Sequence, residues 1–176
     1  MWIQFLEQYN GVTFFKALRL LRSDTINLQA DASKAGYGAT FRNMWIQEKF
    51  PQCWVTFNIA VLEFFPILVL VDMFAKDLAN ATVIFHTDNQ AVCDIIIEMT
   101  SKHAAIIILL RKLLLLLLKN NIDLRAVHVA GKNNVLCDAI SRSQVNKKLL
   151  DEYGMLEKPE KIPAHLHPEL FELGQA

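Results

Sequence analysis

The order of the apolar segments constrains the fold of this 176-residue chain most strongly. Three short segments with strand character, 26–31, 36–41 and 44–50, are joined by short turns and predict an antiparallel meander. Helical segments then alternate with two further strands, 82–86 and 122–129. Strand–helix–strand connections after a meander require a mixed sheet with helices packed on its faces. The pattern therefore predicts an α/β fold with a five-stranded mixed sheet, flanked by helices, whose first three strands are antiparallel.

The helical segments are strongly apolar and are expected to cover this sheet. They span 59–79, 89–99, 104–119 and a last helix that begins at 135. Pro66 interrupts the first of them, which leaves open a start later than Ile59 or a bend just after Glu63. The Leu-rich segment carries two cations at its middle and is too short to span a bilayer, so we expect a core helix that a break at 100–101 caps.

Composition predicts one domain with short extensions. The chain is 53% hydrophobic, and its 18 basic and 18 acidic residues leave no formal net charge, which argues against a strong electrostatic grip on a phosphate backbone. Its three cysteines, Cys53, Cys93 and Cys137, are odd in number and match no metal-finger spacing, which favours a reducing compartment. From about residue 144 the chain becomes charged and proline-bearing, as in a linker.

Four carboxylates lie at the edge of, or beside, these apolar segments. They are Asp31, Glu63, Asp88 and Asp138. A single acid of this kind is better explained as a turn or cap residue, but four such charges are costly unless something compensates them. Two divalent cations would do so, and this is the usual chemistry of two-metal phosphodiester cleavage. If the first and fourth strands are neighbours, the four acids converge on one end of the sheet, and some of their pKa values should be raised without metal.

With these residues in hand, the chain resembles a ribonuclease H domain, most closely the domain that follows reverse transcriptase in retroelements. Residues 31–33 (DAS) and 36–38 (GYG) are similar to the family's first-strand aspartate and glycine-bearing second strand. The glycines also suit a close approach of another backbone. Residues 62–67 (LEFFPI) are similar to the segment with the helix glutamate, and 87–89 (TDN) to the central aspartate motif.

The last motif is the most specific part of the resemblance. Residues 128–142 (HVAGKNNVLCDAISR) are similar to the retrotransposon pattern H-x-x-G-K-x-N-x-x-A-D-x-L-S-R, with cysteine and isoleucine in place of its alanine and leucine. The lead-in 2–15 and the stretch 161–171 resemble DIRS-type retrotransposons, which carry a tyrosine recombinase. The likeness thus covers nearly the whole chain.

The resemblance implies an endoribonuclease that cuts the RNA strand of RNA–DNA hybrids and leaves 5′-phosphate ends. It implies two Mg²⁺ ions, for which Mn²⁺ can substitute, and recognition of 2′-hydroxyls in the minor groove. Residues 1–24 would connect to an upstream reverse transcriptase, 25–145 would form the catalytic domain, and 146–176 would be a linker or tail. Expected partners are the hybrid, that polymerase and a downstream recombinase of the same polyprotein. The chain would work inside the cell, in the cytoplasm or nucleus within a retroelement particle, neither secreted nor in a membrane.

The resemblance also implies roles for the catalytic residues. Asp31 would bridge both metal ions, and Asp88 would be a second strong ligand. Glu63 would hold one ion and orient the 2′-hydroxyl or the water, while Asp138 would complete the other ion's site or cap its helix. His128 would relay protons from a mobile loop, or be an ordinary strand histidine.

Four further residues are predicted to contact nucleic acid. Asn89 would bind a 2′-hydroxyl or cap the helix that follows it, and Ser33 belongs to the first motif. Lys132 and Arg142 would contact phosphates or remain solvated charges. The basic extra helix with which some ribonucleases H grip the hybrid is not evident in the sequence, so we expect weak activity of the isolated domain.

Two other functions remain open. One is a catalytically silent, domesticated copy that serves as a nucleic-acid or protein binding module; the four intact acids argue against it. The other is the same fold acting on DNA, as in integrases or junction resolvases. The motif at 128–142 favours a ribonuclease H over that class.

Overall fold

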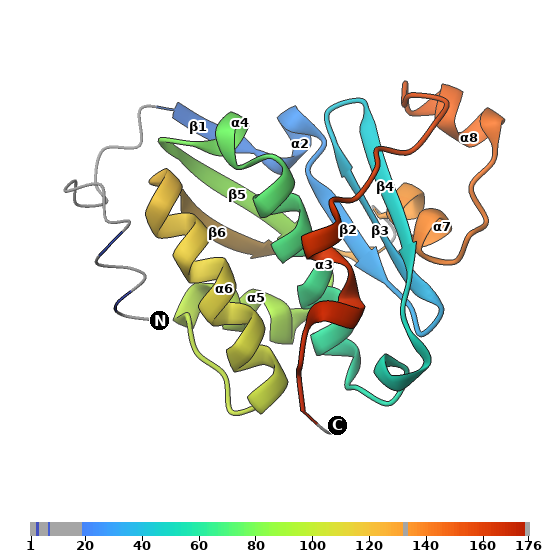
Figure 1. Ribbon diagram of the computed structural model, residues 1–176. Coiled ribbons are helices and arrows are strands. Elements are labelled where there is room, and N and C mark those ends of the chain that lie inside the picture. The colour runs from blue at the N-terminus through green and yellow to red at the C-terminus, as the bar shows by residue number, and fades with distance from the viewer. Residues whose placement is uncertain (1–2, 4–6, 8–18, 132–133, 175–176) are drawn as a thin grey trace.

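The computed structural model describes Ile3, Glu7 and residues 19–131 and 134–174, and Figure 1 shows an α/β architecture with two small sheets. Of the segment 1–24, predicted to connect to an upstream polymerase, only Ile3, Glu7 and 19–24 are described. The first sheet is parallel, in the order β1-β5-β6, and the second is antiparallel, in the order β2-β3-β4. The strands are β1 (Arg19–Arg22), β2 (Gln29–Ala32), β3 (Gly36–Phe41), β4 (Met44–Lys49), β5 (Ala81–Thr87) and β6 (Asp123–His128).

The prediction of one five-stranded mixed sheet is wrong, although its antiparallel meander is present as β2, β3 and β4. The strand predicted over 26–31 begins only at Gln29, because a one-turn helix, α2 (Ser23–Ile26), precedes it and is capped by Asn27 in the left-handed region with φ 47°. Ser23 is fully buried, and its hydroxyl donates a hydrogen bond to the Leu28 carbonyl, so both of these polar groups have a partner within the turn. The chain therefore leaves β5 after Arg22 and pairs with β3 from Gln29 onward.

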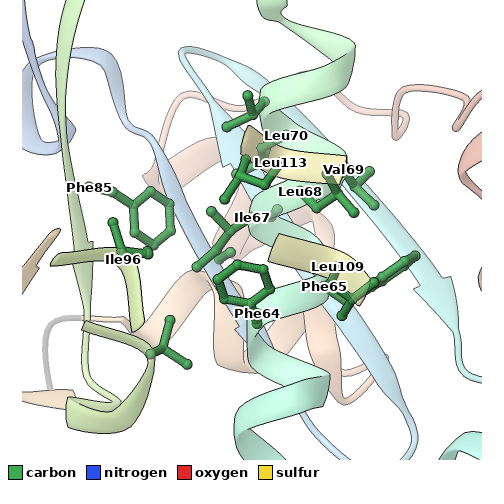
Figure 2. Packing of buried hydrophobic residues seen from close by; sticks show 14 of the residues in the cluster. Phe64, Phe65, Ile67, Leu68, Val69, Leu70, Phe85, Ile96, Leu109 and Leu113 are labelled. Carbon is green, nitrogen blue, oxygen red and sulfur yellow. The ribbon is translucent and has the colours of Figure 1, made fainter. Parts of the chain in front are cut away.

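A helix buried around nearly its whole circumference, α3 (Ile59–Met73), forms the centre of the core. The Asn58 side chain caps it by accepting from the Ala60 amide. The helix begins at Ile59 and continues through Pro66, so the alternative of a later start is wrong. It ends before the predicted residue 79, and a separate turn, α4 (Ala75–Leu78), follows. Figure 2 shows side chains of α3 packed with others from β5, α5 (Gln90–Glu98) and α6 (Ala104–Asn120).

The Leu-rich helix α6 packs against α3, as expected of a core helix. The N-cap residue of α6 is His103, not the predicted 100–101. Ser101 lies two residues before this N-cap, and its hydroxyl accepts a hydrogen bond from the His103 amide. Across the parts of the chain that the structure describes, none of the helices combines the length and apolarity needed to cross a bilayer.

The C-terminal part of the chain is packed on the domain, unlike the linker predicted over 146–176. After α7 (Val135–Ser141) and α8 (Lys147–Glu152), the segment runs back past β4 to α3, drawn in red in Figure 1. The Leu156 amide donates to the Asn43 carbonyl and the Glu160 amide to the Trp45 carbonyl. Four further side chains join the main core: Ile162, Leu166, Phe171 and Leu173. Composition alone did not anticipate this packing.

Candidate active site

Four different elements carry the four predicted acids, and all four side chains are half-buried. Asp31 lies in β2, Glu63 in the second turn of α3, Asp88 directly after β5, and Asp138 in the first turn of α7. They lie close enough for their charges to interact: Asp138 and Asp88 act on Asp31, and Asp88 and Asp31 act on Glu63. The structure thus gathers four acids from distant parts of the sequence into one electrostatic neighbourhood.

Burial and mutual repulsion raise two of these pKa values. Desolvation is the largest cause of the rise in the pKa of Asp31 to about 6; a hydrogen bond from Ser141 opposes it, and the charges of Asp138 and Asp88 add to it. Desolvation also dominates the rise in the pKa of Glu63 to about 7, opposed by a hydrogen bond from Asn89. The prediction that some of these carboxyl pKa values are raised without metal is confirmed.

The donor set has the chemistry that Mg²⁺ or Mn²⁺ requires, although it does not form a closed metal site. Carboxylate oxygens are the preferred ligands of such cations, and the raised pKa values of Asp31 and Glu63 mark negative charge that nothing fully compensates. Within the described parts of the chain, however, no three His, Cys, Asp or Glu side chains are grouped closely enough to hold an ion.

The helix that carries Asp138 lies directly on the strand next to Asp31. Gly38 pairs with Asp31 across β2 and β3, and a Cβ at Gly38 would stand 2.5 Å from Ile140 Cγ2 and 2.9 Å from the Ser141 amide nitrogen. Glycine is therefore required for α7 to approach the sheet, in agreement with the close approach expected from the sequence. Beyond this contact, Ser141 Oγ donates to Asp31 Oδ2 at 2.7 Å.

Asp138 is held by the residue that follows Ser141. Arg142 Nε donates to Asp138 Oδ1 at 2.7 Å, one helical turn away, and both side chains are about half exposed. Arg142 is thus paired with an acid of the site. To make the predicted contact with a phosphate, it would have to give up this ion pair with Asp138.

Residues beside Asp88 occupy the positions expected from the last two motifs. Gly131 lies so close that a Cβ there would be 2.7 Å from Asp88 Oδ2. His128 is exposed at the end of β6, so it is a strand residue, and its Nε2 lies 3.2 Å from the Asp88 carbonyl oxygen. Asn89 caps α5, since its Oδ1 accepts from the amides of the first turn, and its side chain also lowers the pKa of Glu63.

Two predicted nucleic-acid contacts remain, Ser33 and Lys132. Ser33 Oγ donates to the Ser141 carbonyl at 3.1 Å, and Lys132 lies outside the described residues. Sequence reasoning gave no role to Asn134, which is buried and whose Nδ2 donates to the Ala30 carbonyl at 3.1 Å. It also gave none to the hydroxyl of Ser141. The available signals were the place of Asn134 just before a helix and the spacing of three between Asp138 and Ser141, which puts both on one helix face.

No family model matches the chain, and no curated protein matches its sequence. Among solved structures, the chain is similar to the crystal structure of RNase H1 from the halophilic archaeon Halobacterium salinarum NRC-1. The two are 12% identical in sequence, the TM-score is 0.45, and the match covers 72% of this chain and 96% of the archaeal chain.

The raised carboxyl pKa values predict an unusual dependence of stability on pH. Because the folded protein binds protons at Asp31 and Glu63 more tightly than the unfolded chain does, metal-free protein should become more stable as pH falls from about 8 to about 5. This contribution is lost again as pH rises through the two folded-state values. Thermal unfolding in a chelator would measure it, and the double variant Asp31→Asn, Glu63→Gln should flatten the curve. The prediction would be contradicted if stability decreased as the pH was lowered from about 8 to about 5, to the same extent in the wild type and the double variant.

Proposed function

We propose that this chain is an endoribonuclease of the ribonuclease H type, which hydrolyses the RNA strand of RNA–DNA hybrids with two Mg²⁺ or Mn²⁺ ions. The observation that carries the proposal is the gathering of Asp31, Glu63, Asp88 and Asp138 from four elements, with the pKa of two of them raised. Their motif contexts, above all 128–142, support this substrate class. The proposed setting is reverse transcription of a retroelement, within a polyprotein that also carries the polymerase and a recombinase.

The residues of the site would divide the work as follows. Two bound ions would activate a water and stabilise the charge that develops on the scissile phosphate and the leaving oxygen. Asp31, next to both Asp88 and Asp138, is the acid best placed to be shared. Glu63, whose pKa the neighbouring Asn89 side chain lowers, would orient a 2′-hydroxyl or the water. The exposed imidazole of His128 would carry a proton between the Asp88 side of the site and solvent.

Binding of the hybrid would involve Asn89, Ser33, Lys132 and Arg142, with the two cations meeting phosphates. The formal net charge of zero gives the domain little long-range attraction for nucleic acid. We therefore propose that an upstream reverse transcriptase supplies part of the affinity and that the protein acts in the cytoplasm or nucleus with its retroelement particle.

A catalytically silent binding module is the second candidate. One observation favours it: Arg142 forms an ion pair with Asp138 at 2.7 Å and so competes with a cation for that carboxylate. Such a copy would keep the fold and its surface contacts while the carboxylates no longer gather around ions. An intact acid set with raised pKa values favours the enzyme, because silent sites have no need to retain destabilising charges.

Cleavage of a labelled RNA–DNA hybrid tests the proposal. In Mg²⁺ or Mn²⁺, the chain should cut the RNA strand to 5′-phosphate products and leave matched DNA duplex and single-stranded RNA intact. Asp88→Asn should lose the cuts, whereas Asp94→Asn, an exposed acid on α5, should retain them and exclude a contaminating nuclease. No cuts by the folded wild-type protein, even with polymerase supplied in trans, would favour the silent module.

A further inference from the structure

We propose that Ser141 is a positioning residue, which holds the Asp31 carboxylate against the helix that carries Asp138 and so sets the spacing of two metal-binding acids. This inference rests on the proposed function. Nothing in the roles implied by the family resemblance uses this hydroxyl.

The hydroxyl of Ser141 is buried and has two acceptors. Ser141 ends α7 and is 2% exposed. Its Oγ lies 2.7 Å from Asp31 Oδ2 and 2.9 Å from the carbonyl oxygen of Asp138. A hydroxyl has one proton to donate, and a carboxylate is the stronger acceptor, so the bond to Asp31 should dominate.

The backbone around this hydroxyl is fixed from several sides. Ser33 Oγ donates to the Ser141 carbonyl at 3.1 Å, and Gln47 Nε2 donates to the Ile140 carbonyl at 2.8 Å. Gly38 leaves no room between β3 and α7. At the start of α7, Asn134 Nδ2 bonds to the carbonyl of Ala30, the residue before Asp31. The helix is therefore attached to β2 at both ends, and the donor cannot follow Asp31 if that side chain rotates away.

Ser141 is suited to this task because it is neutral. Asp138 and Asp31 repel each other, and the two carboxylates belong to different elements. Arg142 restrains Asp138 by neutralising it, which competes with a cation. Ser141 restrains Asp31 without removing its charge, so the carboxylate remains available to an ion.

Loss of the hydroxyl should therefore weaken metal binding more than it weakens the fold. Partners that orient metal ligands typically contribute about 10- to 100-fold in metal affinity or activity. We expect Ser141→Ala to weaken Mn²⁺ binding about tenfold, and to raise the Mn²⁺ concentration for half-maximal cleavage similarly, with KM for the hybrid unchanged.

Ser23→Ala is the matched control. Ser23, in α2, is also a fully buried serine, but its hydroxyl donates to the backbone carbonyl of Leu28 instead of to an acid. Both variants lose one buried hydrogen bond, so both should lower the unfolding temperature, but only Ser141→Ala should change the Mn²⁺ affinity measured by calorimetry.

The calorimetric outcomes separate this inference from the proposed function. If Asp31→Asn abolishes Mn²⁺ binding, and Ser141→Ala weakens it while Ser23→Ala does not, the positioning role holds. In the Asp31→Asn background Ser141→Ala should add nothing. Wild-type affinity in Ser141→Ala would overturn the positioning role alone. A wild-type protein without Mn²⁺ binding, or Asp31→Asn with undiminished binding, would overturn both proposals.

Discussion

Asp31→Asn is expected to reduce RNA-strand cleavage by at least about a thousandfold and, at the same time, to stabilise the metal-free protein. Asparagine keeps the shape of the side chain and an oxygen that can accept from Ser141, but removes the charge needed by a cation. Metal ions typically stabilise the charge of the transition state by several kcal/mol, and the loss of about 4 kcal/mol lowers the rate about a thousandfold. The pKa of Asp31, raised to about 6 mainly by burial, shows that the ionised carboxylate disfavours the folded state near neutral pH.

The gain in stability can be given a rough size. A rise from 3.8 to about 6 corresponds to about 3 kcal/mol at about 1.4 kcal/mol per pH unit, and solvent near the half-buried side chain reduces this, so we expect about 1–2 kcal/mol. Single-turnover cleavage in Mn²⁺ and denaturant unfolding in a chelator near neutral pH would measure the two effects. Asp24→Asn, an exposed acid on α2, should change neither. A variant that loses both activity and stability would instead indicate that the charge of Asp31 supports the fold.

Removal of residues 146–176 is expected to leave the chain unfolded. The deletion takes six buried apolar side chains from two clusters: Leu150, Met155, Ile162, Leu166, Phe171 and Leu173. At about 1.5–3 kcal/mol each, their burial is comparable to the whole stability of a typical domain, about 5–15 kcal/mol. The deletion also exposes Phe65 of α3, which packs edge-on against Phe171 with ring centroids 5.0 Å apart.

Circular dichroism and proton NMR of the fragment 1–145 would measure this effect. A chain cut after residue 173, which keeps all six side chains, should fold like the full chain and serves as the control. Cooperative unfolding of 1–145 at the wild-type temperature would contradict the prediction and restore the interpretation of this segment as a linker.

The sequence predicted the secondary structure well where a local pattern decides it. The strand over 36–41 has the predicted bounds, the last helix begins at 135 as predicted, and α5 is one residue shorter at each end than the predicted 89–99. The strand predicted over 26–31 is present but begins only at Gln29, because its alternation continues across a turn that only the left-handed Asn27 and the buried Ser23 define. Partner choice between strands depends on such a turn, and periodicity does not encode it.

The packing of the C-terminal segment could not be predicted for a different reason. Average charge and proline content described the segment, whereas a few spaced apolar residues, among them Ile162 and Phe171, determine where it packs. The four acids could be predicted because burial of charge is costly in any fold. The partners that hold them, Ser141 and Asn134, could not, because their contacts exist only once α7 lies on β2.

The division of the strands into two sheets has a mechanical consequence for the acids. Asp31 belongs to β2 and Asp88 follows β5, and these strands touch without sharing a hydrogen-bonded ladder among the described residues. Their separation is therefore set by side chains, which yield more easily than a ladder does. A cation held by both acids would cross-link the sheets, so that metal affinity and the rigidity of the whole domain would rise and fall together.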